Sequence, residues 1–295
     1  MRSFPILSCL LLCVSYASAQ DRQVLPVFLN QFYQHVEMVN PAATAYQYKS
    51  KVIVANKSLD GIFKDVRTNF VAANIRLGLR DSVNRDSHGI GLTLLESREG
   101  PYISRSRVQA SYAWHNSISY NWMLSLGVMA GFINYLYKAT DIYPSQSALR
   151  FTSDVGVFLY QPKKINIGLS LNQFVKSDMA PLEPGLKVKP FGTFIIDYTA
   201  AISPVLDWRN ALICRGPIHK SSFDADLTSV IVVQKMVTAG VHYKVHKGYS
   251  FLIGLESGQM KKNGINLFFS YYKPFLFKDN INVPEVELTI SFFRH

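Results

Sequence analysis

The sequence predicts an all-β protein, a transmembrane antiparallel outer-membrane β-barrel of about fourteen strands, with twelve as the alternative count. Three observations support this prediction. Runs with an apolar residue at every second position recur along the chain, a secretory signal precedes them, and no later apolar run approaches the roughly 20 residues of a spanning helix. Only helices and closed barrels cross hydrocarbon, which offers no partners for free backbone groups. A two-layer soluble sandwich would show the same alternation, but the secretory signal favours the barrel.

Residues 1–19 have the form of a removed secretory signal. Arg2 precedes an apolar stretch over residues 4–14, and Ala17-Ser18-Ala19 has the small-x-small pattern that signal peptidase accepts. We expect cleavage between Ala19 and Gln20.

The cysteines and the composition agree with an exported membrane protein. Cleavage leaves Cys214 as the only cysteine, so no intramolecular disulfide holds the fold. A lipid-anchored Cys9 is the alternative, but the apolar segment ahead of it is short. Charged residues make up 17% of the chain, below the roughly 25% of soluble domains, and the 13% of aromatic residues suits rings at the two membrane edges. The net charge of +11 favours anionic lipid, cell-wall polymer or acidic proteins as partners, because an exported chain meets no nucleic acid.

Residues 20–47 are expected to form an irregular N-terminal segment, and residues 48–295 the barrel. The N-terminal segment lacks a clean period, and Asn40-Pro41 is a turn that stops it before the first strand. The fourteen expected strands are centred near Val54, Ala73, Leu92, Ser111, Leu126, Val157, Leu169, Ile195, Leu212, Ile231, Tyr243, Ile253, Leu267 and Thr289.

The faces of the expected strands follow from where charge is tolerated. In the second strand Asn74, Arg76 and Arg80 share one face, and the opposite face is apolar. A basic side chain facing lipid at mid-depth costs about 2–4 kcal/mol, so the arginine face should line the lumen. Inward-facing glycines leave room either for a plug or for large packed neighbours; they are Gly127, Gly131, Gly156 and Gly168.

The connections between the expected strands alternate in length. Those after even-numbered strands are short (116–119, 161–164, 203–207, 235–237), and those after odd-numbered strands are long (136–150, 176–189, 216–224, 274–284). Segments 80–88 and 246–248 depart from this rule. Outer-membrane barrels have short periplasmic turns and long outside loops, so both termini are expected in the periplasm.

Residue patterns for catalysis, a cofactor or a metal are missing from the sequence. His242 and His246 lie about 13 Å apart on a strand, too far for one zinc ion. The acidic residues are interleaved with arginines, which favours ion pairs over acid–base couples. We predict no enzyme activity and no cofactor, although a barrel hydrolase with Ser and His on separate strands would also lack a local motif.

Short motifs along most of the mature chain occur in a characteristic order. They are Gln20-Asp21, Phe32-Tyr33, Asn40-Pro41-Ala42, Gly89-Ile90-Gly91-Leu92, Gly100-Pro101, Ser111-Tyr112-Ala113-Trp114-His115, Asp154-Val155-Gly156-Val157, Ile167-Gly168-Leu169-Ser170-Leu171-Asn172-Gln173 and Phe269-Ser270-Tyr271-Tyr272. This order resembles the PorP/SprF family of type IX secretion system membrane proteins. The chain departs from the family pattern at residues 57–63 and 283–285.

The resemblance implies a non-enzymatic outer-membrane component of the type IX secretion and gliding machinery, which assists export or surface anchoring of proteins. It implies the periplasmic ring lipoprotein, other components of the machinery and secreted proteins as partners. From the charge placement we predict that Arg76 and Arg80 line the lumen and contact a passenger or partner. A passive or substrate-specific porin is the alternative function, because a barrel of this size holds either a channel or a plug.

Overall fold

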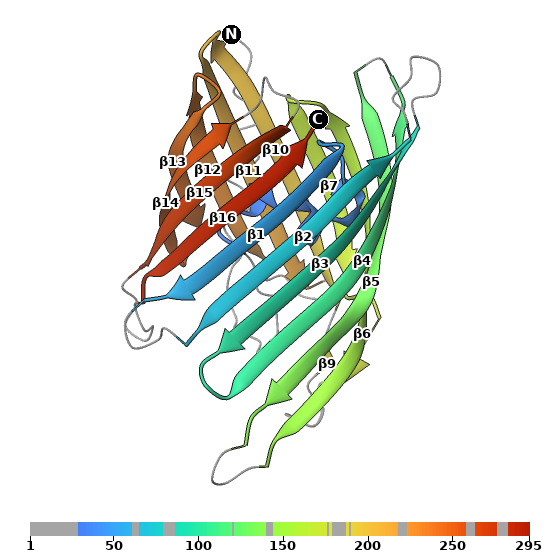
Figure 1. Ribbon diagram of the computed structural model, residues 1–295, viewed down its shortest axis with the longest axis vertical. Coiled ribbons are helices and arrows are strands. Elements are labelled where there is room, and N and C mark those ends of the chain that lie inside the picture. Colours follow the sequence, from blue (N-terminus) through green and yellow to red (C-terminus); the bar gives the residue numbers. More distant parts are fainter. Residues whose placement is uncertain are drawn as a thin grey trace.

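The computed structural model describes residues 29–60, 65–78, 86–119, 121–139, 144–175, 177–178, 187–188, 190–217, 223–257, 263–275 and 283–295. Fourteen antiparallel strands close into one barrel, in the order β1-β16-β15-β14-β13-β12-β11-β10-β7-β6-β5-β4-β3-β2 (Figure 1). Every predicted strand centre falls in a different barrel strand, so the predicted fold class and strand count are confirmed.

The barrel strands are β1 (Ser50–Leu59), β2 (Arg67–Leu77), β3 (Ser87–Glu99), β4 (Ile103–Ser117), β5 (Met123–Tyr137), β6 (Gln146–Gln161), β7 (Ile165–Asn172), β10 (Phe191–Ser203), β11 (Leu206–Pro217), β12 (Asp224–Val233), β13 (Val237–Lys244), β14 (Gly248–Ser257), β15 (Asn263–Pro274) and β16 (Glu285–Arg294). Two further strands, β8 (Ser177–Asp178) and β9 (Lys187–Val188), pair with each other outside the barrel.

The first and last strands close the barrel. β1 pairs with β16 in an unbroken antiparallel ladder from Ser50 opposite Arg294 to Leu59 opposite Glu285. Closure gives both strands a partner on each side, which removes the free edges that hydrocarbon does not tolerate.

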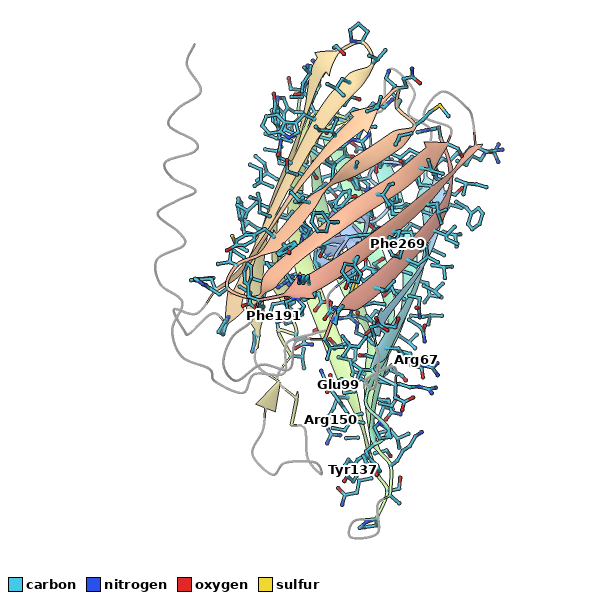
Figure 2. All side chains as sticks on the ribbon, turned by 90° about the vertical axis from the view of Figure 1, so that its left-hand side faces the viewer. Arg67, Glu99, Tyr137, Arg150, Phe191 and Phe269 are labelled. Atoms are coloured by element: carbon cyan, nitrogen blue, oxygen red, sulfur yellow. The ribbon has the colours of Figure 1, made fainter. Side chains whose placement is uncertain are left out.

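Side chains alternate between an apolar outer wall and a luminal face that carries polar side chains together with apolar ones packed against the N-terminal segment. The apolar outward side chains of β2, such as Val71 and Ile75, are exposed, whereas Asn74 is buried and Arg76 half-buried on the inner face. Apolar side chains such as Leu169 and Phe251 keep more than half of their surface exposed on the outer wall. Figure 2 draws the side chains of the wall as sticks and labels Phe269, which is also exposed. A band of this kind is stable against lipid and unfavourable against water. None of the helices in the described residues is long and apolar enough to span a membrane.

The two ends of the barrel differ. The connections 118–122, 162–164, 204–205 and 234–236 lie at the end where β16 finishes, which we call the C-terminal end. At the opposite end the β5–β6 hairpin reaches farthest, at the bottom of Figure 1. We call this the loop end.

Candidate functional site

The described part of the N-terminal segment lies inside the barrel lumen. Residues 29–46, here called the plug, contain η1 (Phe32–Gln34), α2 (Val36–Val39) and η2 (Pro41–Ala43), and nearly all of their side chains are buried. Figure 1 shows these short blue helices behind the front strands of the wall. Within the segment predicted to be irregular, the described residues 29–46 therefore fold as short helical turns inside the lumen.

The plug runs along the lumen from the loop end to the C-terminal end. Glu287, near the start of β16, accepts the backbone N–H groups of Asn30 and Gln31 at 2.5 and 3.0 Å. Just beyond the plug, Tyr48 packs on Phe293 near the end of β16, with 4.4 Å between ring centroids. The chain thus crosses the lumen before it enters the wall as β1.

Side chains of the wall supply hydrogen bonds that the plug backbone lacks. Five plug carbonyls accept bonds from five different strands: Gln34 from Lys51 (2.7 Å), Val39 from Ser170 (2.6 Å), Ala42 from Ser125 (2.7 Å), Thr44 from His115 (2.9 Å) and Tyr46 from Arg76. Because a carbonyl only accepts, His115 must carry its proton on Nε2. Its Nδ1 then accepts from the Tyr160 hydroxyl at 3.2 Å. Each such bond contributes roughly 0.5–1.5 kcal/mol net, and an unmade buried one is more costly.

Asn40 attaches the middle of the plug to the wall. Its Nδ2 donates to the carbonyls of Val157 and Leu169, at 3.1 and 3.3 Å, on β6 and β7. Its Oδ1 accepts the Ala42 N–H at 3.0 Å, which caps η2. One buried amide therefore fixes the local turn and its place in the lumen.

Glycines of the wall make the space in which this turn lies. A Cβ added to Gly127 would collide with the backbone of Ala42, and Cβ atoms on Gly156 and Gly168 would collide with the side chain of Asn40. The sequence analysis expected inward glycines to leave room either for a plug or for large packed neighbours. These three leave room for the plug. Gly131 differs, because its Cβ would meet the backbone of Val108 and Gln109 in the neighbouring strand.

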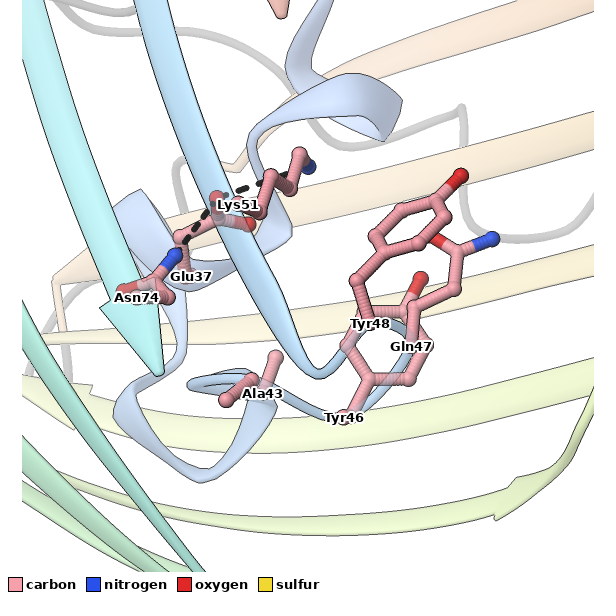
Figure 3. Close-up of a pocket in the computed structure, with 8 residues that line it drawn as sticks. Glu37, Ala43, Tyr46, Gln47, Tyr48, Lys51 and Asn74 are labelled. Atoms are coloured by element: carbon pink, nitrogen blue, oxygen red, sulfur yellow. Dashed lines mark hydrogen bonds and ion pairs between the residues drawn. The ribbon is translucent and has the colours of Figure 1, made fainter. Parts of the chain in front are cut away.

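On the side of the plug away from Asn40, Glu37 carries a buried charge. Glu37 accepts from Asn74 Nδ2 at 3.2 Å and lies 3.5 Å from Lys51 Nζ, beside a small pocket that Tyr46 and Tyr48 also line (Figure 3). Burial, reinforced by the charge of Lys51, lowers the pKa of His35 well below its usual value, so this plug histidine is neutral.

Of the site residues predicted from the sequence, the structure describes Arg76. Arg76 lines the lumen and contacts Tyr46 and Tyr160 of its own chain, while its role toward a partner stays a prediction. Arg80, Ala19 and Gln20 lie outside the described residues. His242 is buried in β13 beside Phe32, and His246 lies in the following turn. No group of three metal-ligating side chains occurs within the part of the chain described.

Asn40 was predicted only as a turn residue, because its wall contacts are distant in sequence.

A family of known proteins matches nearly the whole chain. The family described as "Type IX secretion system membrane protein PorP/SprF" matches residues 21–292. No curated protein matches the sequence.

Solved outer-membrane barrels resemble the fold. The toluene transporter TbuX of Ralstonia pickettii has a TM-score of 0.53 at 11% identity, covering 88% of this chain and 93% of its own. The monoaromatic hydrocarbon channel CymD has a TM-score of 0.54 at 9% identity, covering 92% and 94%. The toluene transporter TodX of Pseudomonas putida has a TM-score of 0.50 at 9% identity, covering 87% and 92%. At these identities the likeness concerns the fold alone.

Proposed function

This chain belongs to the PorP/SprF family of type IX secretion system membrane proteins, and on that premise we propose that it assists export or surface anchoring of secreted proteins. It is an outer-membrane barrel, and the proposed role is non-enzymatic. The proposed partners are the periplasmic ring lipoprotein, other components of the secretion and gliding machinery, and the secreted proteins themselves.

The observation that carries the proposal is the combination of this family with a plug that crosses the lumen. The plug bonds to β1, β4, β5, β7 and β16, on several sides of the wall. A lumen crossed in this way disfavours passive diffusion of solutes, which a passive porin requires. It is compatible with a barrel that works by binding other proteins at its rims and loops.

The proposed orientation has the C-terminal end in the periplasm. The short turns at that end support it, because outer-membrane barrels have short periplasmic turns. The ring lipoprotein would then meet the C-terminal end, and exported proteins the protruding loop end.

Deletion of this protein in its host tests the proposal. We expect type IX passengers to be depleted from the cell surface and the medium, as measured by quantitative mass spectrometry, and restored by the wild-type chain. Affinity purification from detergent-solubilised outer membrane should retrieve other components of the machinery. An unchanged set of surface and secreted proteins, together with retrieval of no such component, would rule the proposed function out.

The predicted contact role of Arg76 and Arg80 is tested in the same purification. We expect the double variant Arg76→Glu, Arg80→Glu to lose partners that the wild-type chain retains. Arg76 also bonds to the plug, so heat-dependent gel mobility must show that the variant barrel is folded. Retention of every partner, with export intact, would remove these arginines from the partner contact.

A further inference from the structure

The outer wall changes from apolar to polar across four neighbouring strands toward the loop end. One cross-strand row on β1 to β4 presents only apolar side chains to the outside: Val54, Val71, Leu94 and Val108. The next outward row toward the loop end is polar in all four strands: Asn56, Asn69, Glu96 and Ser106. Polar side chains are costly against hydrocarbon, so the lipid band ends between these two rows.

A pair of arginines follows that edge. Arg67 on β2 lies directly opposite Arg98 on β3, in the row after the polar one. The adjacent ladder pair, Thr68 and Ser97, is buried on the luminal face, so the alternation of the strands turns both arginines outward. Figure 2 labels Arg67 nearer the loop end than the exposed Phe269.

The arginine pair lies at the height of lipid headgroups. β2 runs from Arg67 to Leu77, and these ends are about 25 Å apart along the membrane normal at the usual rise and a strand tilt of about 40°. The outward row of Leu77 also holds Trp114, an aromatic residue of the kind found at membrane edges. The apolar band of outer-membrane barrels is about 25 Å tall, so the arginine row and the Trp114 row mark its two edges.

The two arginines carry more charge than their neighbours balance. Arg98 donates Nε and Nη2 to one oxygen of Glu96, at 2.9 and 2.8 Å. Arg67 forms no hydrogen bond or ion pair with another residue of the described ranges, although its charge acts on Glu96. Like charges directly opposite each other on paired strands are destabilising. A phosphate between the two guanidinium groups would remove this repulsion and accept paired hydrogen bonds from their planar forks.

We propose that Arg67 and Arg98 bind a phosphate group of the phosphorylated glycolipid that forms the outer leaflet of the outer membrane. The inference does not depend on the export role, but it uses the proposed orientation, in which the loop end faces outward. The asymmetry of the wall supports this leaflet. On the same strands the arginine pair occurs at the loop-end edge, whereas the edge toward the C-terminal end carries Tyr112 and Trp114.

Native mass spectrometry of the folded barrel in detergent tests the proposal. The probe is a lipid A that carries two phosphates, and the comparison lipid is the same molecule after both phosphates have been removed. We expect the phosphorylated lipid to bind the wild-type chain about tenfold more tightly or better, the effect of charge-assisted hydrogen bonds. Equal binding of the two lipids would overturn the proposal.

A double variant tests the two residues. We expect Arg67→Gln, Arg98→Gln to lower the affinity for the phosphorylated lipid A about tenfold. The matched control is Lys138→Gln, Lys247→Gln, which also removes two exposed positive charges from the loop end, away from β2 and β3. Each double variant contains one cation bonded to a carboxylate, since Lys247 donates to Asp224 at 2.7 Å. An equal loss in both variants would assign the binding to the general positive field and overturn the site.

Heat-dependent gel mobility shows that the variant barrels are folded. The titration of the unchanged chain with the two forms of lipid A is a test that needs no variant.

Two further probes separate the sources of phosphate. Phosphatidylglycerol should bind about fivefold more weakly than the phosphorylated lipid A, because a phosphodiester has less charge and fewer free oxygens than a phosphomonoester. Millimolar inorganic phosphate should leave the lipid A bound. Equal binding of the phospholipid, or displacement by inorganic phosphate, would overturn the assignment to the glycolipid.

The proposed function and this inference fail separately. Export that continues without the protein would end the proposed function and leave the affinity for the lipid unchanged. Placement of the loop end in the periplasm would overturn the lipid site as proposed, because the leaflet on that side consists of phospholipid.

Discussion

At the residue scale, a few polar side chains hold the plug against the wall by bonding to backbone groups. Asn40 bonds to two wall carbonyls and to its own turn, and Glu287 accepts two successive backbone N–H groups. These contacts are buried, so removing one partner leaves the other without water to replace it. Single substitutions of this kind should change the position of the plug more than the stability of the surrounding barrel.

Asn40→Ala should loosen the plug. The substitution removes two donors to the wall and the cap of Ala42, so we expect the seated state to lose about 1–2 kcal/mol, a five- to thirtyfold shift toward a displaced plug. The measurement is the frequency of open-channel events of the purified protein in a planar bilayer. Asn56→Ala is the control, because Asn56 bonds to Asn69 at 2.7 Å on the exposed outer wall. Equal behaviour of the two variants would contradict the role given to Asn40.

At the element scale, three strands lack side chains at the point where the plug touches them. Gly127, Gly156 and Gly168, on β5, β6 and β7, lie against Asn40 and the residues just after it. Gly127 lies directly opposite Gly156, and Gly168 is displaced from them by two residues along the ladder. Glycine weakens a strand because it has no side chain to pack, so its use in three neighbouring strands here indicates a close backbone approach.

Gly127→Val should displace the plug, because the new side chain would occupy the place of the Ala42 backbone. Overpacking of this kind costs typically 1–3 kcal/mol. We expect a lower temperature for the heat-dependent gel shift and larger bilayer conductance than in the wild type. Gly192→Val is the matched control, because a Cβ on Gly192 of β10 meets no atom within 4 Å. If Gly192→Val has the same effect, loss of strand glycine in general is the cause.

The sequence predicts an element when the pattern that determines it is local in the chain, and misses it when the determining contacts are distant in sequence. Every barrel strand was predicted, because its alternation reflects lipid on one side and lumen on the other. The plug was not predicted as short helical turns inside the lumen, since its residues have no period and their partners lie up to 257 positions away. The inward glycines indicated available space, but only the fold shows that Gly127 serves the plug and Gly131 a neighbouring strand.

At the scale of the whole molecule, the two ends of the barrel have different surroundings. The plug begins beside Glu287 at the loop end, whereas the chain finishes at His295, at the C-terminal end. The orientation of the barrel thus decides which of these regions faces the periplasm.

Cysteine labelling of intact cells measures that orientation. In a Cys214→Ser background we expect a membrane-impermeant maleimide to label Pro101→Cys, in the β3–β4 connection at the loop end. Val205→Cys, in the β10–β11 turn at the C-terminal end, should be labelled only after the outer membrane is permeabilised. Pro101 and Val205 are both exposed, so access to reagent and not burial determines the difference. The reverse pattern would place the loop end in the periplasm, and that end would then face the periplasmic components of the secretion machinery instead of its released products.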